Sequence, residues 1–152
     1  MVKTIRALLI IAFVAITACG GSTATETTIA TEVAPAATLV LPEASLVSAT
    51  PQQAAATIDT RLGSDGFVLL DVRTPEEYAE GHIAGSDNID FYEAAFADSI
   101  AELDRDASYV VYCHSGNRSS QTLELMRQLG FTDVTDVAGG IVAWAEAGLP
   151  IQ

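Results

Sequence analysis

The stretch YVVYCHSGNRS, at residues 109–119, indicates how this chain of 152 residues is organised. Its apolar part, residues 109–112, predicts a strand that is buried on both faces, as the strands of parallel sheets are. A short polar loop follows directly. Residues 118–129 then predict a helix that ends at Gly130, since glycine commonly follows the last turn of a helix. A strand, a loop and a helix in this order predict one unit of an α/β fold.

The same alternation continues on both sides of this stretch. Further strands are predicted at residues 67–72, 88–89 and 134–137, and further helices at 52–62, from 74 onward, at 93–103 and at 140–147. Two of the helices carry apolar residues along one face: Phe96, Ile100 and Leu103 in one, and Leu123, Met126 and Leu129 in the other. Strands separated by helices imply a parallel sheet. We therefore expect residues 46–152 to form an α/β domain, with a central parallel sheet and helices on both faces.

The N-terminal residues are typical of an exported protein. Lys3 and Arg6 precede ten apolar residues at 7–16, which is the pattern of a signal peptide. The residues that follow, up to Ala18 and Cys19, resemble a bacterial lipobox, in which the cysteine is lipidated and becomes the mature N-terminus. We expect a signal peptide with a lipobox at residues 1–18. The alternative is an ordinary signal peptide followed by a chance cysteine.

Residues 19–45 are expected to hold the lipidated Cys19 and a flexible linker. Thr, Ala, Gly, Ser, Pro and Glu dominate this segment, and such a composition buries too little surface to offset the entropy of ordering the chain. The predicted location is therefore extracytoplasmic, with a lipid anchor in the cell membrane. In a bacterium with two membranes, Gly20 directly after the lipidated cysteine favours the outer membrane.

The net charge excludes some classes of partner. The chain has a formal charge of −13, and without residues 1–18 it has five arginines against twenty acids, a charge of −15. A nucleic acid's phosphate backbone repels a protein with this much negative charge. We therefore expect no nucleic-acid partner. The sequence also shows no cluster of cysteines, histidines and carboxylates with the spacing of a metal site, and no metal ion is expected.

Cys113 is the strongest candidate for a reactive group. It follows a predicted strand directly, and ligands of α/β sheets bind beyond the carboxyl ends of the strands. Backbone N–H groups of the loop, the positive end of the next helix and the guanidinium of Arg118, if it folds over the loop, all favour a thiolate. Gly116 permits a backbone angle that a side chain would obstruct. The alternative is a buried structural cysteine, since free cysteines are often buried.

Other polar residues have simpler interpretations. Asp71 and Arg73, at the end of a predicted strand, are expected to support the neighbouring loop through an ion pair. His82 is expected to be a hydrogen-bonded structural residue, and Trp144 to belong to the core. In the loop itself, Ser115, Asn117 and Ser119 are candidate hydrogen-bond donors, and His114 is a candidate for tuning specificity.

Three motifs together resemble the rhodanese family. Residues 71–78 (DVRTPEEY), followed by 81–86 (GHIAGS) and 88–89, resemble the signature near the start of a rhodanese domain. Residues 113–119 (CHSGNRS) resemble the rhodanese active-site loop, and residues 139–141 (GGI) with Trp144 resemble the closing helix of the family. The motifs occur in the order that the family has, and the resemblance extends from about residue 46 to the C-terminus.

This resemblance implies a fold and an activity. Rhodaneses transfer a sulfane sulfur from a donor such as thiosulfate to a thiophilic acceptor through a cysteine persulfide. By the resemblance, Cys113 is the nucleophile, and residues 114–119 (His114, Ser115, Gly116, Asn117, Arg118 and Ser119) form the substrate-binding loop. Arg118 would attract and orient the anionic donor. The expected partners are a small sulfane donor and a thiol acceptor, which a protein cysteine could also supply, and no cofactor is expected.

Two other functions remain as alternatives. Phosphatases and arsenate reductases of the same fold carry one more residue between the cysteine and the arginine of the loop. Here four residues separate Cys113 from Arg118, which favours a sulfur atom as the substrate over a tetrahedral oxyanion. A persulfide carrier that delivers sulfur to a partner protein is the second alternative.

Overall fold

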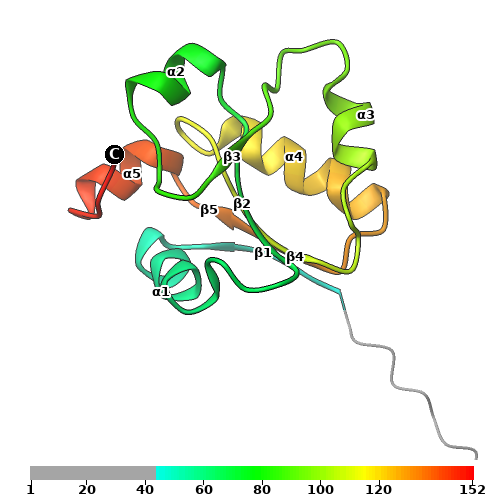
Figure 1. The fold of residues 1–152 in the computed structure, drawn as a ribbon, viewed down its shortest axis with the longest axis horizontal. Helices are drawn as coiled ribbons and strands as arrows, with labels where there is room; N and C mark the ends of the chain where they lie inside the picture. The colour runs from blue at the N-terminus through cyan, green and yellow to red at the C-terminus, as the bar shows by residue number, and fades with distance from the viewer. Residues whose placement is uncertain (1–43) are drawn as a thin grey trace, which may run out of the picture. The chain divides into compact units, whose positions relative to one another are not determined.

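The computed structural model describes residues 44–152 (Figure 1). The predicted signal peptide, the lipidation of Cys19 and all of the predicted linker up to residue 43 lie outside the described residues and stay predictions. In the described residues, no helix is both long enough and apolar enough to cross a membrane. The first strand begins at Ser45, so it includes the last residue of the predicted linker.

Five parallel strands form the sheet. They are β1 (Ser45–Ala49), β2 (Phe67–Asp71), β3 (Asp87–Asn88), β4 (Ser108–Tyr112) and β5 (Asp133–Val137), and they lie in the order β1-β5-β4-β2-β3. The sequence predicts four of these strands and misses β1. This strand pairs with β5 at the edge of the sheet and is largely exposed, with Val47 47% exposed, so it lacks the apolar run of a buried strand.

Helices cover both faces of the sheet, as predicted. They are α1 (Pro51–Arg61), α2 (Pro75–Glu80), α3 (Phe96–Ala101), α4 (Asn117–Gln128) and α5 (Gly140–Glu146). Side chains of α1 and α5 pack against one face, and side chains of α3 and α4 pack against the other. The short helix α2 follows β2 at the carboxyl edge of the sheet (Figure 1). The structure therefore confirms the α/β class with its central parallel sheet.

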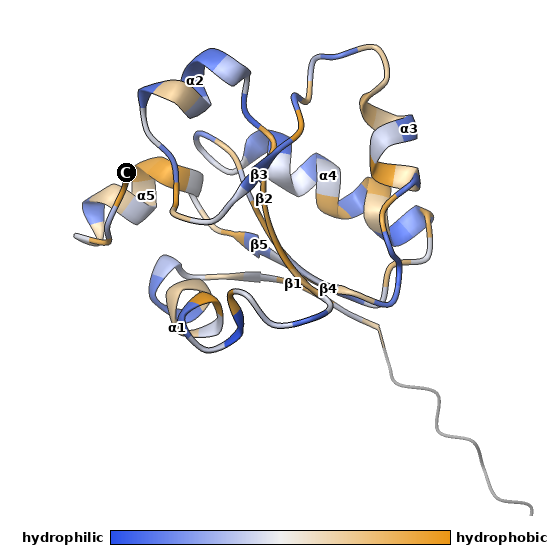
Figure 2. Cartoon of the chain, in the orientation of Figure 1, coloured by the Kyte–Doolittle hydropathy of each residue, from blue (hydrophilic) through white to orange (hydrophobic). Residues whose placement is uncertain are grey.

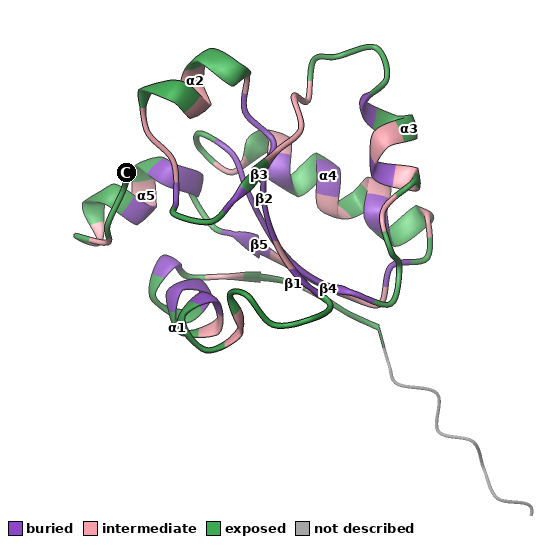
Figure 3. Ribbon diagram, in the orientation of Figure 1, coloured by how far each residue is buried: buried purple, intermediate pink, exposed green. Residues whose placement is uncertain are grey.

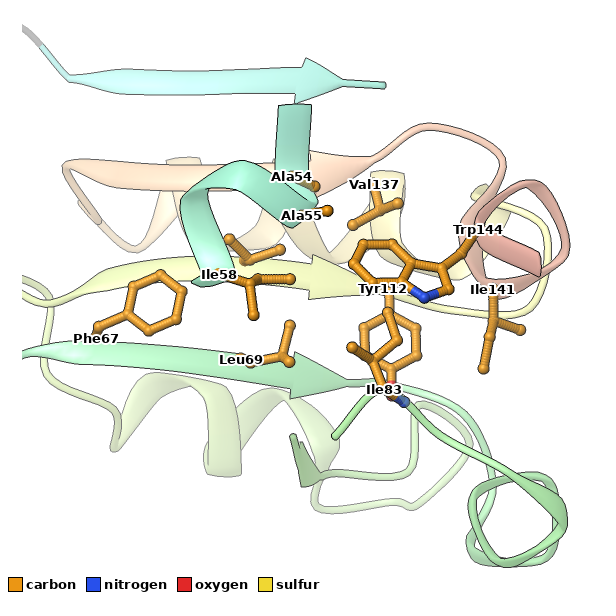
Figure 4. Packing of buried hydrophobic residues seen from close by; sticks show 11 residues of the cluster. Ala54, Ala55, Ile58, Phe67, Leu69, Ile83, Tyr112, Val137, Ile141 and Trp144 are labelled. Atoms are coloured by element: carbon orange, nitrogen blue, oxygen red, sulfur yellow. The ribbon is translucent and has the colours of Figure 1, made fainter. Parts of the chain in front are cut away.

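One core cluster fills the space between the sheet and the pair α1 and α5 (Figure 4). Its members are Ala54, Ala55, Ile58, Phe67, Leu69, Ile83, Val110, Tyr112, Val137, Ile141 and Trp144. Trp144 is a core residue, as expected, and its Nε1–H donates a hydrogen bond of 2.9 Å to the carbonyl of Pro150. This packing holds the start of α5 against the end of β4.

The second cluster lies on the opposite face, beneath α3 and α4. Side chains alternate along a strand, so Tyr109, Val111 and Cys113 point to this face while Val110 and Tyr112 point to the other. Figures 2 and 3 show apolar, buried residues in the central strands and hydrophilic, exposed residues on the outer surfaces of the helices. The alternation places the Cys113 side chain toward the helix that follows its own loop.

Two helices differ from the prediction. The helix predicted at 93–103 begins only at Phe96, because the preceding residues form turns in which the Asp90 carboxylate accepts a hydrogen bond from the Tyr92 N–H. In α4 the buried face consists of Ser119, Thr122 and Met126, while Leu123 and Leu129 are only partly buried. Because Ser119 and Thr122 have small side chains, the start of α4 lies close to the sheet.

Candidate active site

Three loops meet at the carboxyl edge of the sheet. They follow β2, β4 and β5, the three adjacent strands at the centre of the sheet. The loop after β4 carries Cys113, which is a free cysteine and only 1% exposed. Parallel strands end at the same edge, so residues that are far apart in the sequence lie around this sulfur.

Two groups at the start of α4 donate hydrogen bonds to the Cys113 sulfur. The N–H of Gly116 lies 3.1 Å from Sγ, and the hydroxyl of Ser119 lies 3.5 Å from it. Gly116 has a φ of 91°, in the left-handed region, and this conformation turns the chain from the loop into α4. The sulfur therefore faces hydrogen-bond donors at a helix N-terminus, an arrangement that suits a negatively charged atom.

The first turn of α5 fixes the back of the loop. The N–H of Ile141 donates to the carbonyl of Cys113 over 2.8 Å, and the N–H of Val142 donates to the carbonyl of His114 over 3.1 Å. These bonds require close contact at Gly140, where a Cβ atom would lie 2.7 Å from the carbonyl carbon of His114. The sequence shows the glycine pair at 139–140 but gives no sign that it contacts a loop of another strand.

Arg118 forms an ion pair that the sequence does not predict. Its two terminal nitrogens lie 2.7 and 2.8 Å from the two carboxylate oxygens of Glu77 in α2, and its side chain is 12% exposed. The hydrogen bonds to Glu77 raise the pKa of Arg118, and the charge of nearby Cys113 adds to this effect. The predicted role of Arg118 is to attract and orient an anionic donor, and in the structure its guanidinium is paired with a carboxylate.

Glu77 and Tyr92 are two site residues that sequence reasoning misses. Glu77 is the third residue of a capping box with Thr74, a pattern that is visible in the sequence, but its second partner is 41 residues away. The ring of Tyr92 lies over the guanidinium of Arg118, with 5.4 Å to its centroid, and this residue is 69% exposed. Arg118 is thus enclosed by a carboxylate and an aromatic ring.

Asp71 and Arg73 form a buried ion pair beside the loop. The two side chains are joined over 2.7 Å, and their exposed fractions are 0% and 5%. The guanidinium also donates to the carbonyl of Gly81, and the Asn88 amide donates to the carbonyls of both residues. No described contact joins either side chain to Cys113, so their position is that of supporting residues.

The other predicted loop residues lie farther from the sulfur. The His114 side chain is 57% exposed and has its Nδ1 3.6 Å from Glu77. Ser115 and Asn117 are exposed, and the side-chain Oδ1 of Asn117 accepts a hydrogen bond from Gln121. Of the candidate side-chain donors, only Ser119 has a described bond to the sulfur.

His82 lies outside the loop. Its ring stacks on Tyr78 with 3.8 Å between the ring centroids, and its backbone N–H and carbonyl both pair with Gln152. The position fits the structural interpretation, because the residue joins the end of α2 to the C-terminal segment.

Asp136 of β5 is a further carboxyl group near the site, and no motif or spacing in the sequence singles it out. It is 4% exposed; its Oδ2 accepts a hydrogen bond of 3.2 Å from Ser48, and its Oδ1 has no partner within hydrogen-bond distance among the described residues. Burial raises the pKa of this carboxyl group. Asp136 lies inside a strand, and the spacing of apolar residues that predicts the strand does not distinguish a carboxyl group near the site from an ordinary polar residue.

A cavity of about 330 Å³ lies beside the loop. Charged and apolar residues line it together: Arg73, Glu77, Glu80, Gly81, His114, Ile141, Val142, Ala145 and Ile151. In residues 44–152 no group of three or more histidines, cysteines, aspartates and glutamates is arranged to hold a metal ion. The reactive group that the structure shows beside this loop is the Cys113 thiol, with hydrogen-bond donors directed at its sulfur.

Acid should weaken the fold through Glu77. Its hydrogen bonds to Arg118 lower its pKa from 4.5 to about 2, so the ion pair stabilises the folded state above pH 4.5 and is lost as the pH falls toward 2. The side chain is 28% exposed, and solvent screening reduces the effect to about 1–2 kcal/mol. Denaturant unfolding at several pH values should show Glu77→Gln less stable than the wild type at pH 6 and equal to it near pH 2. The exposed neighbour Glu76→Gln is the control, and a constant difference for Glu77→Gln at all pH values would contradict the prediction.

Known proteins similar to this chain share one family. Residues 54–147 match the Rhodanese-like domain family. The chain is 36% identical over 88 residues to a sulfurtransferase of Allochromatium vinosum, with 58% of this chain and 80% of that protein covered. It is 40% identical over 84 residues to the thiosulfate sulfurtransferase GlpE of Pseudomonas aeruginosa (55% and 74% covered), and 33% identical to thiosulfate sulfurtransferase 16, chloroplastic, of Arabidopsis thaliana (69% and 96% covered).

Solved structures agree with the sequence comparison. A rhodanese-related protein from Thermoplasma volcanium superposes with a TM-score of 0.59 at 35% identity, covering 69% of this chain and 96% of that one. A rhodanese-like domain protein from Staphylococcus aureus superposes with a TM-score of 0.55 at 30% identity, covering 69% and 97%. The family match over residues 54–147 and the relatives that are covered over nearly their whole length lead to one conclusion: this chain belongs to the Rhodanese-like domain family, and it has sulfurtransferases among its relatives.

Proposed function

We propose that this protein transfers a sulfane sulfur through a persulfide on Cys113. One observation carries the proposal: the sulfur lies at the carboxyl end of β4 and accepts hydrogen bonds from the Gly116 N–H and the Ser119 hydroxyl. A thiolate is the nucleophilic form of cysteine, and donors aimed at the sulfur favour this form. The sulfurtransferase names of the relatives support the same reaction class.

The reaction has two steps, each with a balanced exchange of one sulfur. The Cys113 thiolate attacks the outer sulfur of thiosulfate, the bond between the two donor sulfurs breaks, and sulfite leaves with the electron pair. A thiolate acceptor, or cyanide in the test tube, then attacks the outer sulfur of the persulfide, and Cys113 leaves as a thiolate. No oxidant is needed, and the covalent intermediate implies ping-pong kinetics.

The loop provides the stabilisation that both steps require. Negative charge stays on a sulfur atom throughout, and the Gly116 N–H, the Ser119 hydroxyl and the start of α4 are already oriented toward this position. Fixed donors of this kind stabilise an anion without reorganising during the reaction. The carbonyls of Cys113 and His114 accept hydrogen bonds from the N–H groups of α5, which hold the loop in this conformation.

Mass spectrometry of the purified protein tests the proposal. Incubation with thiosulfate should add about 32 Da, the mass of one sulfur, to the peptide that contains Cys113, and cyanide should remove it as thiocyanate. The absence of this mass gain with thiosulfate and with persulfide donors would contradict the proposal. A mass gain that only a partner protein's thiol removes would favour the carrier function, and release of phosphate from an aryl phosphate would favour a phosphatase.

A further inference from the structure

Each arginine in residues 44–152 already has a partner. Four are paired with carboxylates: Arg61 with Asp133, Arg73 with Asp71, Arg118 with Glu77 and Arg127 with Glu124. The fifth, Arg105, precedes β4 at the opposite edge of the sheet from the candidate site and donates to the backbone carbonyls of Ala101 and Leu129. The described residues contain no lysine, so every Lys or Arg side chain among them has a carboxylate or carbonyl partner.

One of these pairs lies close to the sulfur. Arg118 is the cation whose pKa responds to the charge of Cys113, and both of its terminal nitrogens are occupied by Glu77. His114 is the nearest other basic group, and its ring lies against the same carboxylate. Glu80 adds a further negative charge to the cavity beside the loop. The two groups that donate hydrogen bonds to the sulfur, the Gly116 N–H and the Ser119 hydroxyl, carry no formal charge.

An arrangement with few free positive charges favours donors with little negative charge. Thiosulfate carries two negative charges, and its encounter with the Cys113 thiolate places a third in the same pocket. Like charges at short distance repel, and an already paired guanidinium offsets only a small part of this repulsion. A monoanionic thiosulfonate, or the persulfide of a small thiol, brings at least one charge fewer to the same sulfur.

We infer that the site selects sulfane donors less negatively charged than thiosulfate, and that Glu77 sets this selection by neutralising Arg118. The inference rests on the proposed sulfur transfer by Cys113 and specifies its donor class. Glu77 acts here as a positioning residue, through the guanidinium that it holds. For a thiosulfonate, the Cys113 thiolate attacks the terminal sulfur, the sulfur–sulfur bond breaks, and a sulfinate leaves with the electron pair.

Two donors of the same shape provide the test. Methanethiosulfonate differs from thiosulfate in that a methyl group replaces one charged oxygen. We would measure kcat and KM for both donors with the purified full chain and cyanide as the acceptor, and divide each kcat/KM by the donor's rate with free cysteine. The wild type should prefer methanethiosulfonate by about fivefold or more, and the preference should diminish at high salt.

Variants of Glu77 separate its charge from its structural role. Glu77→Gln frees the charge of Arg118, and kcat/KM for thiosulfate should rise about fivefold, mainly through KM, against about twofold or less for methanethiosulfonate. Glu77→Asp keeps the negative charge and should keep the wild-type preference. Glu76→Gln removes the same charge from an exposed neighbour in α2 and should change neither donor by more than about twofold.

The outcomes distinguish this inference from the proposed function. If neither donor adds sulfur to Cys113, the proposed function fails and the inference with it. If both donors react but the wild type prefers thiosulfate, or Glu77→Gln changes both donors equally, only the inference fails. An equal effect of Glu76→Gln would also overturn it, because the overall charge of the domain would then explain the selection.

Discussion

Serine in place of Cys113 is expected to reduce sulfur transfer about a thousandfold or more, to the level of the uncatalysed reaction. A hydroxyl is not ionised near neutral pH and cannot form the persulfide. The fold should tolerate the change, since the Gly116 N–H and the Ser119 hydroxyl can bond to an oxygen at the same position. We expect a change in unfolding free energy below about 1 kcal/mol. Thiosulfate-to-cyanide transfer and thermal unfolding, measured on the same preparation, check both parts.

The chain provides a matched control for this substitution. Cys19→Ser removes the other cysteine, which lies outside the family match at residues 54–147. It should leave the turnover number per molecule unchanged, because the proposed reaction needs only Cys113. Turnover by Cys113→Ser within tenfold of the wild type, or an equal loss in both variants, would show that the nucleophile is not Cys113.

Alanine in place of Gly140 should damage both stability and activity. The residue has a φ of 59°, and a Cβ atom would lie 2.7 Å from the carbonyl carbon and oxygen of His114, which are backbone atoms. The backbone conformation costs about 1–2 kcal/mol for a residue with a side chain, and the overlap adds about 1–3 kcal/mol. The loop must move away from α5, so kcat/KM should fall at least tenfold, because small displacements of a nucleophile have large effects on rate. Denaturant unfolding and transfer kinetics measure the two effects.

Gly130→Ala is the control for Gly140→Ala. Gly130 also has a positive φ, of 85°, but a Cβ atom there would meet no atom within 4 Å. This variant should lose about 1 kcal/mol from the backbone conformation alone and should retain full activity. If the two variants are equally stable and equally active, the contact between α5 and the loop does not hold the loop in place.

The order of strands and helices could be read from the sequence because burial leaves a local pattern. The runs that became β2 and β4 are apolar on both faces, since helices cover the sheet on both sides. β1 was not predicted because an exposed edge strand does not need a continuous run of apolar residues. The start of α3 was misplaced because Asp90 holds the preceding residues in a turn, and a periodic spacing of apolar residues does not reveal where such a turn ends.

The candidate site could be predicted only in part, for a related reason. The position of Cys113 after a strand and before a helix is local information, and so is the left-handed glycine at residue 116. The pairing of Arg118 with Glu77 depends on how α2 folds back over the loop after β4, which one chain's sequence does not specify. The role predicted for Arg118 came from the loop alone, and a carboxylate from another element offsets its charge.

The two hydrogen bonds from α5 to the Cys113 loop also set the order in which this site is completed. The N–H groups of Ile141 and Val142, which hold the carbonyls of Cys113 and His114, belong to the last helix of the domain. During synthesis, β4 and α4 are made before these two residues, so the loop around the sulfur cannot gain this support until α5 has been added. The loop becomes rigid only when the C-terminal helix docks, and amide hydrogen exchange at Ile141 and Val142 therefore reports directly on how often the loop opens.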